Sequence, residues 1–130
     1  MAADHHELEE LLRAAAEALA LRDAAAAHRA LDLAWARLAV HIRAEHKVLF
    51  PALAEVPELS EGLALLRKDH DAFMTALAGA VQGLAAPAPD VAFAAAALAQ
   101  MTPRLAAHNA LEEADLYPKA DALPMRARLL

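Results

Sequence analysis

The chain contains no cysteine among its 130 residues. This absence excludes a disulfide framework, a zinc site built on thiolates and an iron–sulfur cluster with cysteine ligands. Glycine occurs only three times and aromatic residues make up 4% of the chain. No Gly-rich phosphate loop and no nucleophile elbow is present. Several common cofactor and nucleotide sites are therefore excluded at the outset.

The chain also lacks a long apolar run, an apolar signal core at its N-terminus and a basic stripe. Residues 81–99 come nearest to an apolar run, but Pro87, Pro89 and Asp90 interrupt them. A transmembrane helix needs ~20 consecutive apolar residues. The formal net charge of −6 argues against binding to a phosphate backbone. We therefore expect a cytoplasmic protein with no nucleic-acid partner and no membrane partner.

Alanine and leucine dominate the chain, and hydrophobic residues make up 59% of it. Both residues lead the helix-propensity scale, so we predict an all-α protein. A chain of this length forms one domain, residues 1–130, with a core of its own. Helical spacing of apolar residues predicts four helices, from residue 3 or 4 to Arg22, from Asp23 to Phe50, from Ser60 to Leu84 and from Asp90 to Leu116. Short connections favour an up-down-up-down four-helix bundle over about residues 3–118, followed by a short tail, residues 119–130.

Single residues predict where these helices begin and end and what they bury. Asp23, Ser60 and Asp90 are candidate N-caps, because each stands at the start of a helical pattern. A proline disfavours helical geometry in the residue before it, so the second and fourth helices should end before the prolines at 51 and 118. Trp35 and Phe93 fall on the apolar stripes, and we expect both to pack in the core.

A short motif occurs twice. The first copy contains His41, Glu45 and the run Leu49-Phe50-Pro51, and the second contains His108, Glu112 and the run Leu116-Tyr117-Pro118. The copies lie 67 residues apart (108 − 41), which indicates two related halves. Four residues along a helix correspond to about 400° of rotation, so each His and its Glu project from nearly the same side. Imidazole and carboxylate groups together suit iron, zinc or manganese.

The first helices of the two halves also match each other. The dipeptide Asp4-His5 is matched by Asp69-His70, and apolar residues follow both histidines at plus three and plus seven. His5 and His70 therefore share the apolar stripes, whereas His6 falls on the polar side. A surface position in a fraying terminus is the alternative for His5, and a core histidine bonded to a neighbour is the alternative for His70. The repeat favours a metal-ligand role for both.

Six polar residues from four helices are thus expected to face one interior: His5, His41, Glu45, His70, His108 and Glu112. An ionised Glu is costly to bury without a partner, and bound cations remove that cost. The alternative is that the helices splay at this point and water solvates the carboxylates. The His-Glu-x-x-His pattern of zinc proteases and the Glu-x-x-His pattern of ferritin-like bundles are both absent.

The order of these residues, with Leu-Phe-Pro and Leu-Tyr-Pro behind the two His/Glu pairs, resembles the hemerythrin-like family, also called the HHE cation-binding domain. The resemblance covers about residues 3–118. It implies a four-helix bundle that holds a non-haem di-iron centre with bridging carboxylates. Carried over residue by residue, it implies that two iron ions are bound by His5, His41, Glu45, His70, His108 and Glu112.

The chain departs from the oxygen-carrying members of that family at two positions. These members have a further His four residues after the third-helix ligand, where this chain has Met74. They also have a carboxylate five residues after the last His, where this chain has Glu113. The internal repeat favours Glu112, because Glu45 also stands at plus four. It leaves Glu113 and His46 as groups that hydrogen-bond to a ligand or face solvent.

With both carboxylates bridging, each iron would have two His and two carboxylate oxygens, and an oxo or hydroxo bridge would add one more donor. About one position per iron then stays exchangeable in an octahedral sphere, which is a more open centre than an oxygen carrier needs. We therefore expect a monomer or small homo-oligomer that binds or reacts with dioxygen, peroxide or nitric oxide in a sensing, binding or redox role. The alternatives are a di-iron peroxidase or oxidase, and a bundle that metal only stabilises. The same residue types also suit manganese and zinc.

Overall fold

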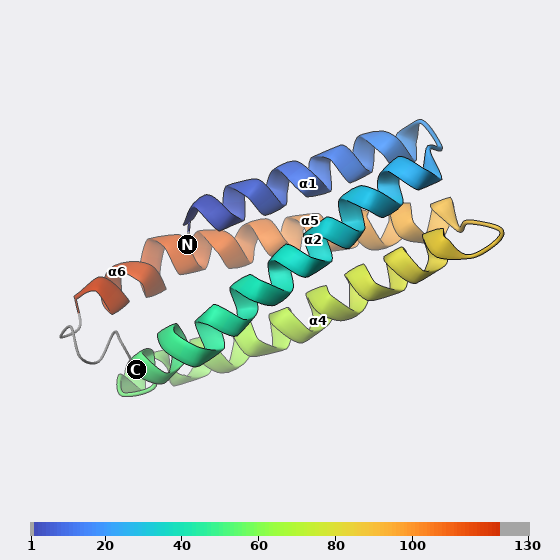
Figure 1. The fold of residues 1–130 in the computed structure, drawn as a ribbon. Helices are drawn as coiled ribbons and strands as arrows, with labels where there is room; N and C mark the ends of the chain where they lie inside the picture. Colours follow the sequence, from blue (N-terminus) through green and yellow to red (C-terminus); the bar gives the residue numbers. More distant parts are fainter. Residues whose placement is uncertain (1, 123–130) are drawn as a thin grey trace.

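The protein is an all-α four-helix bundle, as predicted. The computed structural model describes residues 2–122, and no β-strand occurs within that range. The four long helices are α1 (Ala2–Ala20), α2 (Ala24–Ala44), α4 (Ser60–Ala85) and α5 (Val91–Leu111). Consecutive helices run in opposite directions along the bundle, with the α1–α2 turn and the α4–α5 loop at the same end (Figure 1). Within residues 2–122, no helix is long and apolar enough to cross a membrane.

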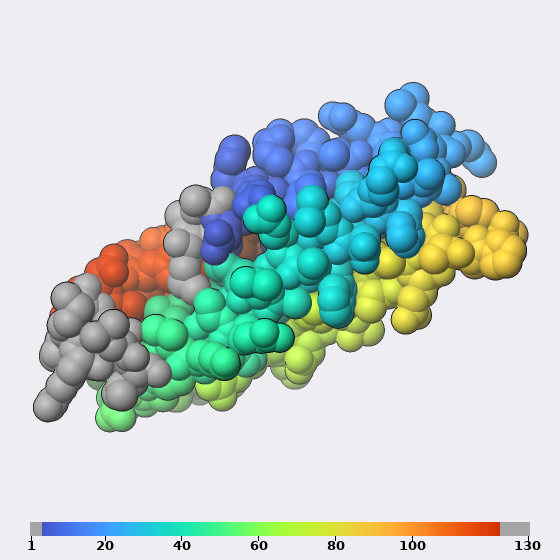
Figure 2. Space-filling view, viewed as in Figure 1, coloured from blue at the N-terminus to red at the C-terminus, as the bar shows by residue number. Residues whose placement is uncertain are grey.

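Each long helix packs against two others and leaves its remaining face to solvent. Helix α1 contacts α2 and α5, and α4 contacts α2 and α5, so the four helices close a ring around one core. The space-filling view shows α1 and α2 packed side by side along the near face (Figure 2). The buried stripe of α2 repeats every three or four residues and consists of Ala27, Leu31, Ala34, Leu38 and His41. This spacing is that of one helical face directed at a core.

Two aromatic residues that the sequence places in the core lie at its edge instead. Trp35 is 39% exposed and Phe93 is 52% exposed. Trp35 follows the buried Ala34 by one residue, and one residue is about 100° of helical rotation, so its side chain leaves the buried arc. Phe93 precedes the buried Ala94 and lies against α4 close to Gly79. Both predictions of core packing are therefore wrong.

The helix ends follow local chemistry with one exception. The side chain of Asp23 accepts a hydrogen bond from the Ala26 backbone N–H at 3.0 Å, and Asp90 accepts one from the Phe93 N–H at 2.9 Å, so both predicted N-caps are confirmed. Ser60 is not an N-cap. The 3₁₀-helix η2 (Pro57–Leu59) leads directly into α4, so Ser60 already has helical dihedral angles. Helix α1 ends at Ala20 rather than at Arg22, which adopts a left-handed φ of 56°.

The second and fourth predicted helices do not end before their prolines. Helix α2 continues into a π-helical turn, η1 (Glu45–Leu49), and then into the short helix α3 (Phe50–Leu53). In the same way α5 continues into η3 (Glu112–Leu116) and α6 (Tyr117–Asp121). In both places the proline falls in the first turn of the new α-helical segment, directly after the π-helical turn.

The π-helical turns begin at the two glutamates of the repeated motif. The backbone N–H of Phe50 donates to the Glu45 carbonyl, and the N–H of Tyr117 donates to the Glu112 carbonyl. These i to i+5 bonds insert one extra residue into each helix, a feature that often occurs at functional sites. The chain therefore remains helical to Asp121, beyond the predicted start of the tail, and residues 123–130 of that tail lie outside the described range.

Candidate metal centre

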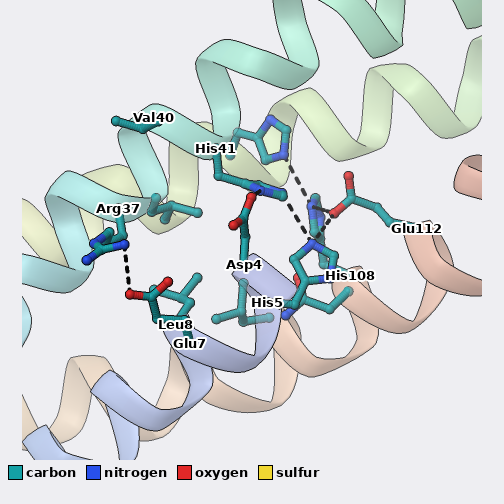
Figure 3. Close-up of a pocket in the computed structure, with 13 residues that line it drawn as sticks. Asp4, His5, Glu7, Leu8, Arg37, Val40, His41, His108 and Glu112 are labelled. Atoms are coloured by element: carbon teal, nitrogen blue, oxygen red, sulfur yellow. Dashed lines mark hydrogen bonds and ion pairs between the residues drawn. The ribbon is translucent and has the colours of Figure 1, made fainter. Parts of the chain in front are cut away.

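The four long helices and the two π-helical turns bring six polar side chains together inside the bundle. They are His5 on α1, His41 on α2, Glu45 on η1, His70 on α4, His108 on α5 and Glu112 on η3. Every one of them is buried, and both glutamates are 0% exposed. The labelled members His5, His41, His108 and Glu112 point toward one another (Figure 3). All six residues predicted for the site thus lie in one cluster.

The histidines form two pairs, one from each half of the chain. The Nε2 atoms of His5 and His41 lie 3.2 Å apart, and those of His70 and His108 also lie 3.2 Å apart. Each pair joins the first long helix of its half to the second. His6, the neighbour of His5, is exposed, so His5 is the member of that dipeptide that faces the cluster.

Each buried carboxylate connects one histidine pair to the other. Glu45 Oε1 lies 3.3 Å from His41 Nε2 and 3.2 Å from His70 Nε2. Glu112 Oε1 lies 3.1 Å from His108 Nε2 and 3.2 Å from His5 Nε2. Two overlapping donor groups result, and Glu112 belongs to both: Glu45, His70, His108 and Glu112 in one, and His5, His41 and Glu112 in the other.

The outer nitrogen of each histidine has a polar partner of its own. His41 Nδ1 lies 3.3 Å from Asp4 Oδ2, and His108 Nδ1 lies 3.2 Å from Asp69 Oδ2. These aspartates are the equivalent members of the repeated Asp-His dipeptides. When an imidazole donates its Nδ1–H to a carboxylate, its Nε2 carries a lone pair directed inward, which is the form that binds a metal.

The other two histidines are held in the same way but by unlike partners. His5 Nδ1 lies 3.3 Å from Glu113 Oε1, and His70 Nδ1 lies 3.0 Å from His46 Nε2. Glu113 and His46 each follow a buried glutamate by one residue, and both are exposed. The structure therefore places them behind the histidine ligand candidates, in one of the two positions that the sequence left open for them.

The centre has more buried acceptor atoms than donors. Among residues 2–122, Glu45 Oε1 and both carboxylate oxygens of Glu112 are buried without a hydrogen-bond donor. The nearest nitrogens are histidine Nε2 atoms, which present lone pairs when the Nδ1–H is donated outward. Lone pairs facing lone pairs in a buried site repel each other, and bound cations would turn both sets into ligands. The donor set thus fits bound metal cations.

Burial and charge also perturb the titration of these groups. Burial lowers the pKa of His5 and of His108, because it penalises the charged imidazolium. Burial acts in the same direction on His41, but the carboxylates of Glu45 and Asp4 outweigh it and raise the pKa of His41. Burial opposes ionisation of Glu45, yet the nearby imidazoles of His41 and His70 favour its charged form and lower its pKa to about 2. Glu45 therefore stays ionised near neutral pH.

A family model, the hemerythrin HHE cation-binding domain, matches residues 1–120. The chain belongs to this family. The match spans the whole bundle, and with it all six residues of the cluster, so this HHE domain contains His/Glu groups that could hold metal. No curated protein and no solved structure matches the chain.

Three polar side chains of the site were not predicted from the sequence. Asp4 and Asp69 hold the histidines of the neighbouring helices, and the repeated Asp-His dipeptide was the signal for them. Tyr117 brings its hydroxyl to the His5 side of the cluster, and the aromatic position of the repeated motif was its signal. Met74, by contrast, packs against the apolar core.

Proposed function

We propose that this HHE domain holds a non-haem di-iron centre that binds or reacts with dioxygen, peroxide or nitric oxide, in a sensing, binding or redox role. The observation that carries this proposal is the pair of fully buried carboxylates, each in contact with one histidine from each half of the chain. A site for a single metal ion needs only one carboxylate of this kind. Two histidine pairs that share two carboxylates fit a pair of metal ions.

In this proposal each half of the chain supplies the histidines of one metal position. His5 and His41 would hold one metal, His70 and His108 would hold the other, and Glu45 and Glu112 would be shared between them. Imidazole and carboxylate ligands without thiolate or thioether suit iron in either oxidation state. When bound, two irons supply exchangeable coordination positions and one-electron redox steps. The hydrogen bonds to Nδ1 would fix the tautomer and orientation of each ring and make its Nε2 a stronger ligand.

A cavity of about 300 Å³ joins the cluster to the surface of the bundle between α1 and α2. Leu8, Leu38 and Leu105 form part of its wall, and Asp4, Glu7 and Arg37 supply polar groups. Glu7 and Arg37 form an ion pair at 2.7 Å between the two helices (Figure 3). A cavity of this size admits water and diatomic or triatomic molecules to the histidines, and this supports a small molecule as the ligand.

Metal content and an absorption spectrum test the proposal. The protein is loaded with ferrous iron without oxygen, desalted, assayed for metal and then exposed to air. We expect about two irons per chain and charge-transfer bands that appear on oxidation, as bridged ferric pairs with nitrogen and oxygen ligands give. Adding nitric oxide to the reduced protein should change the spectrum, because the centre keeps exchangeable positions. A protein that retains no iron, or only one zinc ion, would refute the di-iron assignment.

A further inference from the structure

The two halves of the site have equivalent residues at most positions, and they differ in the aromatic residue that follows each π-helical turn. Phe50 and Tyr117 occupy equivalent places, directly after η1 and η3. The Phe50 ring stacks on His70 with centroids 5.6 Å apart and planes at 1°, and the Tyr117 ring stacks on His5 at 5.7 Å and 26°. Each aromatic ring thus covers the first histidine of the opposite half. The difference between them is one hydroxyl group.

That hydroxyl points at the metal-facing atoms of one histidine pair. Tyr117 Oη lies 3.1 Å from His5 Nε2, 3.5 Å from His41 Nε2 and 3.3 Å from Glu45 Oε2, to which it donates. Glu112 Oε2 is the equivalent carboxylate oxygen, and no donor among residues 2–122 reaches it, since Phe50 stands where the hydroxyl would be. The asymmetry therefore reaches the innermost atoms of the site.

We propose that Tyr117 makes the two metal positions unequal, and that its hydroxyl, which donates to Glu45 Oε2 in this structure, donates instead to a small ligand bound at the position of His5 and His41. This inference rests on the di-iron centre proposed above. At the position of His70 and His108 the equivalent ring is that of Phe50, which has no hydroxyl to donate. The position of His5 and His41 therefore binds oxygen-containing or anionic small ligands more tightly, and Tyr117 acts as a positioning residue there.

Azide binding to the iron-loaded, oxidised protein tests the role of the hydroxyl. Tyr117→Phe is the sharpest variant, because it keeps the ring and reproduces what the chain already has at residue 50. Tyr117→Leu is the control that removes ring and hydroxyl together. We expect both variants to keep two irons per chain and to bind azide roughly tenfold more weakly than the wild type, the effect of one lost hydrogen bond to a charged ligand. Azide affinity comes from a titration of its charge-transfer absorption.

Each other outcome counts against the proposal in a recognisable way. Azide affinity within twofold of wild type in Tyr117→Phe would show that the hydroxyl does not contact the ligand. A large loss in Tyr117→Leu with none in Tyr117→Phe would assign the effect to ring packing. A phenolate-to-iron absorption band in the wild type, absent from Tyr117→Phe, would show that Tyr117 is itself a metal ligand. A wild type that holds fewer than two irons would overturn the di-iron centre, and this inference with it.

Discussion

Replacing Glu112 by glutamine should stabilise the metal-free protein and, at the same time, weaken metal binding. Glu112 is 0% exposed and both of its oxygens lack a donor, while two histidine Nε2 atoms lie 3.1 and 3.2 Å from Oε1. The substitution replaces a buried carboxyl group by a neutral amide. It also introduces an amide N–H₂ that can donate to the inward lone pair of His5 or His108. A residue kept for folding would not behave in this way.

The size of the effect follows from the groups involved. An unsatisfied buried polar group costs about 1–3 kcal/mol, so satisfying it should return about 2 kcal/mol to the free energy of unfolding. At about 2.1 cal/mol/K of unfolding entropy per residue, a chain of 130 residues shifts its Tm by roughly 4 °C per kcal/mol. Metal-free Glu112→Gln should therefore melt about 7 °C above the metal-free wild type.

Thermal unfolding at pH 8, with and without ferrous iron in the absence of oxygen, measures both effects. Iron should raise the Tm of the wild type, because it binds only the folded state, and should raise that of Glu112→Gln much less. Glu113→Gln is the matched control. It makes the same change one residue later, at a side chain that is 43% exposed, and should alter the metal-free Tm by no more than about 2 °C. A metal-free Glu112→Gln protein that melts below the wild type would refute the reasoning, since Glu112 would then be stabilising the fold.

Three further predictions concern the surroundings of the centre. Asp69→Ala should weaken iron binding about 10-fold to 100-fold by freeing the His108 ring. Asp4→Ala should weaken it less, because the Asp4 side chain is 59% exposed, whereas that of Asp69 is 17% exposed and also pairs with Arg104. Competition with a chelator measures both affinities, and equal losses in the two variants would contradict this prediction. Val40→Trp should slow azide association several-fold without changing iron content, because Val40 lines the cavity and is 67% exposed. Leu65→Trp on α4 is the stopped-flow control, at a residue that is 55% exposed and does not line the cavity. Equal rates in the wild type and both variants would exclude this route. Iron should dissociate as the pH falls below about 6, since protons then compete with iron for the imidazole nitrogens. Metal analysis after desalting at several pH values follows the loss, and full retention at about pH 4 would argue against histidine ligands.

Local patterns predicted much of this protein because they depend on residues close in the chain. His41 and Glu45 lie four residues apart, so a helix brings them to one side whatever else the chain does. Asp23 and Asp90 cap the helices that follow them through bonds to a backbone N–H three residues on. The apolar stripe that contains His5 and His70 depends on the same short-range period. For each of these features, the partner atoms lie within about two turns of helix.

Other features depend on how closely the helices approach one another. Trp35 follows a buried alanine in the sequence, but the sequence does not show how much of the helix surface is buried. The neighbouring helix determines that. The π-helical turns at Glu45 and Glu112 each add one residue within a helix. The prolines that follow predict that the helix is disturbed there, but not that the disturbance is a π-helical turn. The helix was therefore predicted to stop where it in fact continues in a shifted hydrogen-bonding register.

The sequence by itself determined that this is a helical bundle and which side chains share a helix face, because helical period and capping act over a few residues. Only the tertiary structure decided which atoms meet. His5 Nδ1 lies beside the carboxylate of Glu113, 108 residues away in the chain. The equivalent atom, His70 Nδ1, lies instead beside the imidazole of His46. The hydroxyl of Tyr117 likewise reaches a histidine 112 residues earlier in the chain. Such contacts depend on how the helices pack to within a few ångströms of one another. The spacing of side chains along one helix does not predict them.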